Sequence, residues 1–244
     1  MKSYAVVIPA RLASTRLPNK PLVDILGKSL IERTYNQVIQ AIDPNKVYVL
    51  TDDEIIINHC KERGIQVVLT SKNCLTGTDR VAEFAEMTNF DYYINVQGDE
   101  PLMNPNNIEI IIEQVENSDG EILNGYAEID LEEDFRSLTI PKVVFRPDGR
   151  LLYMSRSAIP GNKNGEFTKA FKQVCVYAFP KKALIDFYKC NSKTFLENIE
   201  DIEILRFLEL GYEVRMLKLS KDSIAVDVPE DIEKVIIHLS QSND

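Results

Sequence analysis

The chain has 244 residues, of which 44% are hydrophobic, and this length and composition predict one large domain with a sizeable buried core. Its formal net charge of −10 argues against a general nucleic-acid binder, which needs a basic surface, but leaves room for a local basic pocket that takes a small anion. No apolar run approaches the roughly 20 residues of a membrane span, and the first residues lead straight into an apparent strand without a signal peptide, so we expect a cytoplasmic protein.

The first half of the chain alternates short apolar runs with patterns of helical spacing. The runs predict strands, and the patterns between them predict helices. In chain order the expected elements are a strand at Val6–Ile8, a helix at Lys28–Ile42, a strand at Val47–Leu50, a helix ending near Arg63, a strand at Gln66–Leu69, a helix at Thr78–Met87, a strand at Tyr92–Val96 and a helix at Asn107–Val115. This alternation indicates a doubly wound, parallel sheet, whose ligands bind beyond the carboxyl ends of the strands.

The pattern changes after about residue 120. Strands are expected at Lys142–Phe145 and Leu151–Met154, on either side of a Pro-Asp-Gly turn, and at Phe171–Phe179. This β-rich middle predicts an annex to the main sheet. The remaining expected elements are helices at Ala183–Tyr188 and Ile199–Leu210, a strand at Tyr212–Leu217 and a last helix from Pro229.

The segment 9–21 holds three cations, Arg11, Arg16 and Lys20, and follows the first expected strand directly. It contains three prolines and no glycine, so it is neither a P-loop nor a dinucleotide fingerprint. Arg binds phosphate through a planar fork and Lys as a point charge, while Ser14 and Thr15 add hydroxyl donors. The segment indicates a site for a polyanion such as a triphosphate; the alternative is a solvated surface loop.

Two carboxylates follow expected strands elsewhere in the chain. Asp99 comes straight after the fourth strand, beside Gly98, which permits close backbone approach to a ligand. Asp227 precedes the last helix. Because Mg²⁺ in proteins commonly uses one or two carboxylates and takes its other ligands from substrate and water, the two residues are candidates for one metal site. The alternatives are a turn at Asp99 and a helix cap at Asp227.

The hydroxyl-rich connection from Thr70 to Arg80 joins the third strand to a helix. It suits recognition of a nucleobase or ribose, or it caps the helix. Arg80 is either a ligand contact or the partner of Asp79 or Glu83 in an ion pair.

Hydrolysis by a catalytic triad is not expected. The chain has two histidines, and neither lies near a plausible Ser or Cys nucleophile. Its four cysteines are too far apart for a metal knuckle and are expected to be reduced thiols.

Five motifs, at residues 9–22, 76–80, 95–102, 152–160 and 226–231, occur in an order that resembles the 3-deoxy-manno-octulosonate cytidylyltransferases, the CMP-Kdo synthetases of bacterial lipopolysaccharide assembly. The resemblance spans nearly the whole chain. It implies an α/β nucleotidyltransferase (Rossmann-like) fold with a mixed, mostly parallel sheet flanked by helices. It also implies one domain over residues 1–244, a homodimer made through an annex at about residues 139–195, a Mg²⁺ cofactor, and CTP and a 2-keto-3-deoxy sugar acid as substrates.

The resemblance and the loop chemistry together assign the candidate site residues. The catalytic residues are Arg11, Lys20 and Asp99, and the metal ligands are Asp99 and Asp227. The nucleotide is assigned to Ala10, Arg11, Ser14, Arg16, Lys20, Thr70, Gly77, Arg80 and Gln97. The sugar acid is assigned to Gln97, Arg156, Gln173, Tyr177, Glu197, Glu203 and Ile204.

Two positions depart from the family pattern at the sugar end. Gln173 stands where the family commonly has His, and Ile204 where it commonly has Gln. Loss of an amide that fixes sugar hydroxyls changes what the pocket accepts, so the acid is Kdo or a close amino or deoxy variant.

Other functions stay open at this stage. One alternative is cytidylyl transfer to a sialic-like sugar or a phosphonate. Another is uridylyl or guanylyl transfer to a sugar 1-phosphate, although those loops are usually rich in glycine. A third, from another class, is a non-catalytic nucleotide-binding protein.

Overall fold

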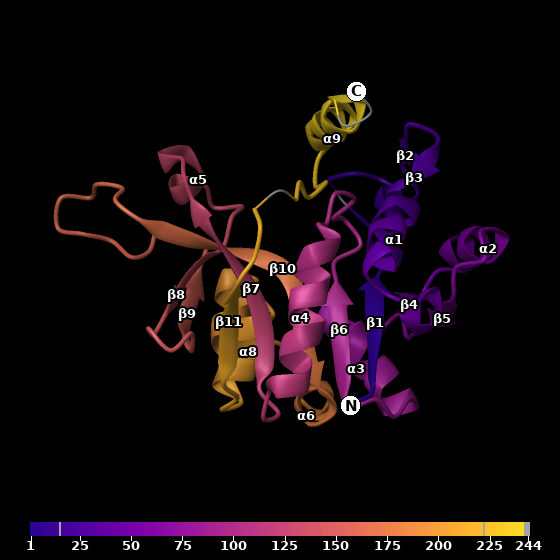
Figure 1. Cartoon of the computed structure of the whole chain (residues 1–244), viewed down its shortest axis with the longest axis horizontal. Coiled ribbons are helices and arrows are strands. Elements are labelled where there is room, and N and C mark those ends of the chain that lie inside the picture. The colour runs from indigo at the N-terminus through magenta and orange to yellow at the C-terminus, as the bar shows by residue number, and fades with distance from the viewer. Residues whose placement is uncertain (15, 222, 242–244) are drawn as a thin grey trace.

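A single mixed sheet forms the centre of the molecule (Figure 1), in a computed structural model that describes residues 1–14, 16–221 and 223–241. Seven of its strands lie in the order β11-β7-β10-β6-β1-β4-β5. Their bounds are Tyr4–Pro9 (β1), Val47–Thr51 (β4), Val67–Leu69 (β5), Tyr92–Val96 (β6), Ile122–Ile129 (β7), Ala170–Pro180 (β10) and Val214–Lys218 (β11). All neighbouring pairs are parallel except that β10 runs antiparallel to both β6 and β7. The predicted α/β fold with a mostly parallel sheet is confirmed.

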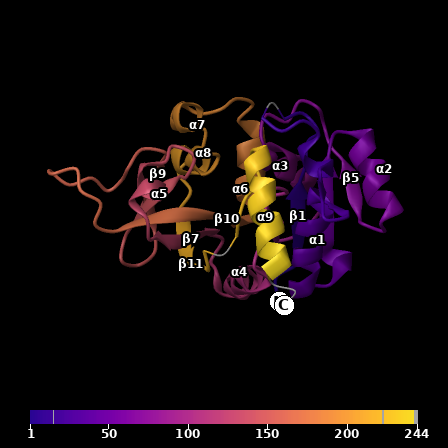
Figure 2. The ribbon, with the colours of Figure 1, turned by 90° about the horizontal axis from the view of Figure 1, so that it is seen from above.

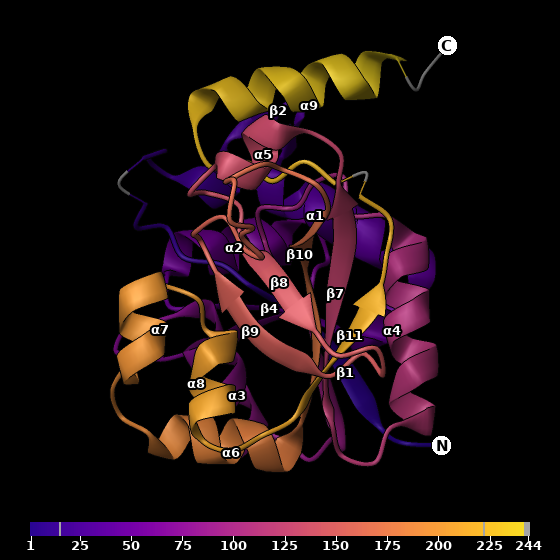
Figure 3. The same cartoon turned by 90° about the vertical axis from the view of Figure 1, so that its left-hand side faces the viewer.

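The β-rich middle forms a hairpin beside this sheet (Figure 3). Its strands are Lys142–Phe145 (β8) and Leu151–Ser155 (β9), and β8 pairs with the first part of β10. The second part of β10 lies between β6 and β7. One long strand therefore connects the hairpin to the main sheet.

Helices cover both faces of the sheet. Leu30–Ala41 (α1) and Pro105–Asn117 (α4) pack on one face, and Gly77–Met87 (α3), Lys181–Lys189 (α6) and Ile204–Glu209 (α8) pack on the other. The remaining elements are the helices Glu54–Glu62 (α2), Glu132–Arg136 (α5), Phe195–Glu200 (α7) and Pro229–Gln241 (α9), the short strands Asp24–Ile25 (β2) and Lys28–Ser29 (β3), and the 3-10 turns Lys20–Leu22 and Pro44–Lys46. None of the helices in the described ranges is long and apolar enough to cross a membrane.

Strand β1 explains why the first apolar run is unbroken. Val6 and Ile8 point into the core under α1 and α4, while Ala5 and Val7 point into the core under α3 and α6. Side chains alternate between the two faces of a strand, so a strand covered on both faces needs apolar residues at every position. Segment 9–21 begins at the carboxyl end of β1, so it starts at the edge of the sheet where the parallel strands end.

Two sequence predictions fail in the second half of the chain. Strand β7 was not predicted, because Asn124 and Gly125 resemble a turn; the amide of Asn124 instead donates to the carbonyls of Val174 and Val176 at an irregularity in β10. The single helix expected at Ile199–Leu210 is wrong. Asp201 adopts a left-handed conformation (φ 51°), which ends α7 and separates it from α8.

Candidate active site

A cavity of about 670 Å³ opens at the carboxyl ends of β1 and β6. The segments that line it are the loop after β1, the start of α3, the loop after β6 and three pieces of the last third of the chain. Its lining residues include Ala10, Arg11, Ser14, Arg16, Lys20, Cys74, Gly77, Arg80, Gln97, Gly98, Asp99, Lys193, Asp201, Glu203 and Asp227. Nearly all the predicted nucleotide residues and both predicted metal ligands therefore line one cavity. Thr15 lies outside the described residues.

Lys20 joins the two carboxylates at the centre of this cavity. Its Nζ lies 2.7 Å from Oδ2 of Asp99 and 2.9 Å from Oδ1 of Asp227, and Arg16 contacts the same Asp227 oxygen at 3.1 Å. Burial opposes the charged form of Lys20, but the two carboxylates outweigh it and raise the pKa of Lys20 above its usual 10.5. The two predicted metal ligands therefore contact the same ammonium at the centre of the cavity.

Backbone contacts bring Asp227 to this position. The amide of Val226 donates to the carbonyl of Asp99 at 2.9 Å, which fixes the two loops side by side. Asp231 accepts hydrogen bonds from the amides of Asp227 and Val228, at 3.0 and 3.2 Å. Asp231 thus satisfies the backbone amides before α9, and the Asp227 carboxylate faces cations instead. The helix-cap interpretation of Asp227 is not what the structure shows.

Gly98 is required by the packing of two strand ends. A Cβ at this position would lie 2.7 Å from the carbonyl oxygen of Pro9, and 3.3 Å from Cδ1 of Ile31. Thr34 on α1 also donates to the carbonyl of Gly98 at 3.2 Å. The close backbone approach that the sequence predicts at Gly98 is made here to the end of β1, and Gly98 also lines the cavity.

The start of α3 forms the next wall of the cavity. The amides of Gly77 and Thr78 donate to the carboxylate of Glu203, at 3.2 and 2.9 Å, as does the Thr78 hydroxyl. Burial raises the pKa of Glu203 despite these hydrogen bonds. Glu203 therefore holds the helix terminus that faces the cavity, and a proton on it is easier to retain than on an exposed carboxyl.

Arg80 lines the cavity but is held by residues other than the two expected from sequence. Its NH2 group lies 3.1 Å from Oδ1 of Asp52, and NH1 donates to the hydroxyl of Thr70. Thr70 is itself buried and does not line the cavity. Asp79, in turn, caps α3 and pairs with Arg206 at 2.8 Å.

Behind this wall lies a fully buried ion pair. The guanidinium of Arg206 donates from Nε and NH2 to both oxygens of Glu197, each at 2.6 Å, and it stacks over the ring of Phe187. Both charged side chains are inaccessible to solvent. Glu197, predicted to bind the sugar acid, instead connects α7 to α8.

Four other predicted sugar residues are not among those that line the cavity. Tyr177 and Ile204 are buried in the core under α3 and α6. The side chain of Gln173 donates to Asn124 at 3.0 Å. Arg156 donates to the carbonyls of Glu200 and Asp201, at 2.6 and 3.0 Å, and to those of residues 138 and 139. Of the predicted acid-binding residues, Gln97 and Glu203 line the cavity.

The polar lining residues missed by the sequence prediction include Lys193, Asp201 and Cys74. Lys193 and Asp201 form an ion pair of 2.6 Å, which depends on the break between α7 and α8. Cys74 lies in the loop before α3, and its thiol donates to Glu83 at 3.0 Å. Burial, with help from Glu83, raises the pKa of Cys74 to about 12, so this thiol stays protonated at neutral pH. In the sequence, the hydroxyl-rich connection from Thr70 to Arg80, which contains Cys74, was the feature that predicted a ligand contact in this part of the cavity.

Comparison with known proteins agrees with this geometry. A family model described as Cytidylyltransferase matches residues 5–220. The 3-deoxy-manno-octulosonate cytidylyltransferase of Protochlamydia amoebophila (strain UWE25) is 38% identical over 245 residues, which cover 97% of this chain and 94% of that protein. The enzyme of the same description from Fusobacterium nucleatum subsp. nucleatum is 38% identical and covers 97% of both chains.

A solved structure shows the same architecture. The CMP:2-keto-3-deoxy-manno-octonic acid synthetase complexed with CTP superposes with a TM-score of 0.90 at 31% identity, over 98% of this chain and 99% of that one. The fold, the cavity and these relatives together show that the chain belongs to the cytidylyltransferase family, among the nucleotidyltransferases known as 3-deoxy-manno-octulosonate cytidylyltransferases or CMP-Kdo synthetases.

Proposed function

We propose that the chain transfers the cytidylyl group of CTP to the anomeric oxygen of 3-deoxy-manno-octulosonate, and that the product supplies lipopolysaccharide synthesis. The observation that carries this function is the single cavity in which Lys20 lies between Asp99 and Asp227. Its volume of about 670 Å³ suits a nucleotide with part of a second substrate. The curated relatives carry the matching name over nearly the whole chain.

The reaction is an in-line displacement at the α-phosphorus. The anomeric hydroxyl of the acid forms a new bond to this phosphorus and loses its proton, while the bond to the β-phosphate oxygen breaks and pyrophosphate leaves. We assign Arg11, Arg16 and Lys20 to the triphosphate, where they bind it and offset the charge that grows on the leaving group. Among the described residues no His or Cys stands in the cavity as an unprotonated base, so positioning and charge contribute most of the rate.

A divalent cation fits the donor set of this cavity. Asp99 and Asp227 would supply two hard oxygen donors, and their shared contact with Lys20 supports this assignment. The described residues contain no group of three or more candidate ligands, so the remaining positions would belong to phosphate oxygens and water, as is usual for Mg²⁺. When bound, Mg²⁺ supplies neutralisation of the α-phosphate and lowers the pKa of the attacking hydroxyl.

The sugar acid would lie at the side of the cavity formed by Gln97 and Glu203. Glu203 is anchored to the start of α3, so its position is fixed before substrate arrives. The other five predicted acid residues, Arg156, Gln173, Tyr177, Glu197 and Ile204, would shape this end through the packing behind it. The substitutions Gln173 and Ile204 would then alter the acid preference indirectly.

The resemblance also leads us to propose a homodimer in the cytoplasm. The predicted contact surface is the annex at residues 139–195, where Leu138 beside it and Leu152 on β9 are 67% and 59% exposed. A dimer would bury such leucines. Light scattering of purified protein would measure the mass of the assembly, and substitution of Leu152 by Glu should shift it toward the monomer.

The test of the function is a pyrophosphate-release assay with a panel of nucleotides and acids. We expect release with CTP and 3-deoxy-manno-octulosonate, and product of the mass of the CMP-sugar. Faster turnover with an amino or deoxy variant, a sialic-like sugar or a phosphonate would reassign the acid. Release only with UTP or GTP and a sugar 1-phosphate would reassign the reaction, and tight CTP binding without release for any acid would indicate a nucleotide-binding protein.

A further inference from the structure

The ion pair of Lys193 and Asp201 is a part of the cavity wall that the mechanism above does not use. Lys193 lies in the connection from α6 to α7, and Asp201 is the left-handed residue that ends α7. Nζ of Lys193 lies 2.6 Å from Oδ1 of Asp201, and both residues line the cavity. The Lys193 side chain is 28% exposed and the Asp201 side chain 72%, so the lysine is the more buried member of the pair.

The location of this pair matches the end of the cavity assigned to the acid. Asp201 stands two residues before Glu203, in the turn between α7 and α8. That turn is fixed to the end of β9, because Glu200 accepts hydrogen bonds from Ser155 and from the amide of Arg156, at 2.6 and 2.8 Å. The wall that carries Lys193 and Asp201 is therefore rigidly placed and distinct from segment 9–21.

The substrate itself demands a cation near this wall. In a 2-keto sugar acid the carboxylate is bonded to the carbon that carries the attacking hydroxyl. In the reactive complex it must approach the negatively charged α-phosphate, and the two anions repel each other unless a cation lies between or beside them. The pKa of Asp201 is held low by Lys193 first, and also by Arg156 and Arg11, which shows that this wall lies within electrostatic reach of the nucleotide loop.

The cation expected from sequence for this task is already engaged. The guanidinium of Arg156 donates to backbone carbonyls of residues 138, 139, 200 and 201. Arg80 pairs with Asp52, and Lys20 with both site carboxylates. The ammonium of Lys193 has three hydrogens, and Asp201 accepts one of them, so donors remain for a ligand in the cavity.

We propose that Lys193 binds the carboxylate of the sugar acid, and that Asp201 holds its ammonium toward the cavity as a positioning residue. This assignment rests on the proposed cytidylyl transfer to such an acid. The alternative is an ordinary surface ion pair that fastens the end of α7; pairs of that kind contribute only about 0–1 kcal/mol to stability and nothing to substrate recognition.

The decisive variant is Lys193→Met, assayed for pyrophosphate release with CTP and 3-deoxy-manno-octulosonate. We expect KM for the acid to rise roughly 10- to 100-fold, as for loss of a hydrogen bond to a charged group, while KM for CTP changes less than about 2-fold. Lys193→Arg should restore most of the loss because it keeps the charge. Asp201→Asn should raise KM for the acid by a smaller factor.

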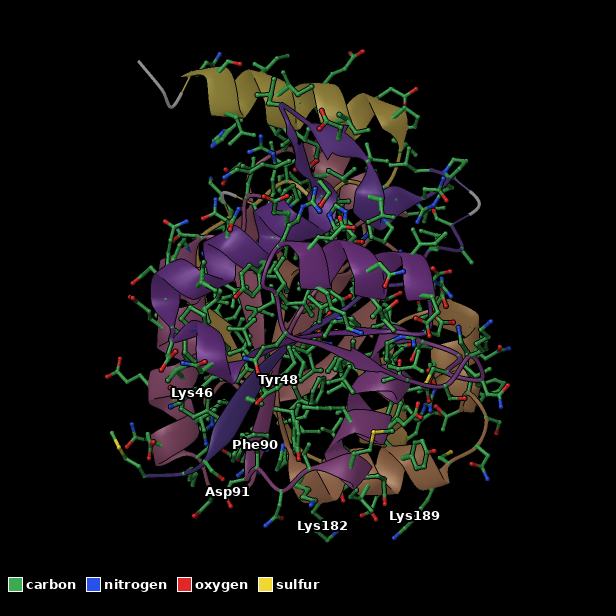
Figure 4. The ribbon with its side chains drawn as sticks, turned by 90° about the vertical axis from the view of Figure 1, so that its right-hand side faces the viewer. Lys46, Tyr48, Phe90, Asp91, Lys182 and Lys189 are labelled. Carbon is green, nitrogen blue, oxygen red and sulfur yellow. The ribbon has the colours of Figure 1, made fainter. Side chains whose placement is uncertain are left out.

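A neutral analogue separates carboxylate binding from general damage. The wild-type enzyme should prefer the acid to its C1 carboxamide, and this preference in kcat/KM should largely disappear in Lys193→Met. The matched control is Lys182→Met: Lys182 is an exposed lysine on α6, paired with Asp186 at 3.0 Å, at the amino end of β6 and far from the cavity (Figure 4). It should leave both KM values and the acid preference unchanged.

The possible outcomes distinguish this assignment from the function on which it rests. An unchanged acid preference in Lys193→Met, in an active enzyme, would overturn the role of Lys193 alone. A rise in KM for CTP instead of the acid would assign Lys193 to phosphate and equally overturn it. Absence of pyrophosphate release in the wild type would refute the proposed function itself.

Discussion

The ammonium of Lys20 contacts both site carboxylates, and its single positive charge offsets part of their combined negative charge. Arg16 adds a second cation to Asp227. Without these contacts, Asp99 and Asp227 would repel each other across a partly buried cavity. The loop cations therefore stabilise the site carboxylates of the protein itself, in addition to the triphosphate role proposed for them.

Replacement of Asp99 by Asn tests this centre. The change keeps the shape but removes one negative charge from the pair that holds Lys20 and fits a divalent ion. We expect kcat to fall at least 100-fold, which corresponds to a loss of roughly 3 kcal/mol of barrier stabilisation. Steady-state pyrophosphate release at saturating CTP and acid measures it.

Asp148→Asn is the control for this variant. Asp148 lies in the β8–β9 turn and pairs with Arg146 at 2.9 Å, on the surface. Its variant should retain wild-type turnover. Turnover of Asp99→Asn close to that of the wild type would contradict the assigned role of Asp99.

Single residues of the site could be predicted from the sequence where each one follows the end of an expected strand. Arg11, Lys20 and Asp99 each follow a strand, and in a parallel sheet such residues gather at one edge. Lys193 and Asp201 were not predicted, because their ion pair depends on the left-handed conformation of Asp201, which lies inside a segment that has a continuous helical pattern in the sequence. Nothing in the local spacing signals that break.

Helices and strands whose apolar residues recur at regular spacing were also predictable from the sequence. Elements in which other residues interrupt that spacing were not. The predicted strands at the start of the chain and the helices between them agree with the structure to within a few residues. Strand β7 has Asn124 and Gly125 in its interior. The asparagine donates to β10, and glycine is needed next to it because a Cβ there would collide with Leu219. Both reasons are tertiary, so local propensity could not reveal them.

The contact between α1 and α2 makes a prediction about pH. Ser29 caps α1 by accepting from the amide of Glu32 at 3.2 Å, and its hydroxyl lies 2.7 Å from Nε2 of His59 on α2. Burial, and then Arg63, lowers the pKa of His59 below 6.5, so the folded state favours the neutral ring. The stability from this group is complete above pH 6.5 and is lost as pH falls below that value.

Urea unfolding at pH 7.5 and 5.5 measures this loss. The wild type should lose more free energy of unfolding between the two values than His59→Gln does. An NMR titration should place the midpoint of the His59 ring below 6.5. A midpoint above 6.5, or an equal pH dependence in both proteins, would contradict the account of this contact.

At the scale of the whole molecule, the last helix, α9, lies across the top of the structure, as the view from above shows (Figure 2). Val235 on α9 and Val226 before it are buried with Leu17, Ile25 and Leu30 in a small core separate from the two main ones. This cluster fastens the loop after β1 to the segment that carries Asp227. The topology that produces it was only partly predictable, because the insertion of antiparallel β10 between β6 and β7 depends on pairing between distant segments.

Substitution of Val235 by Asp should lower the activity while leaving most of the fold intact. An unpaired carboxylate in this small core costs several kcal/mol, so α9 should detach and Asp227 should lose its place. We expect kcat/KM to fall roughly 10-fold or more, while far-UV circular dichroism loses little beyond the signal of one helix. Ile237→Asp, on the same helix but 57% exposed, is the matched control and should behave as the wild type. Global unfolding of Val235→Asp would contradict the independence of this cluster.

The backbone hydrogen bond from Val226 to Asp99 also has a consequence for synthesis of the protein. A chain leaving the ribosome presents Lys20 and Asp99 long before Asp227, and its early segments begin to fold as they emerge. Until α9 has cleared the exit tunnel, Lys20 has one carboxylate partner, and Leu17 and Leu30 lack the cover of Val235. The nascent chain can therefore present all the strands of its main sheet before the segment that carries Asp227 joins Lys20 and Asp99.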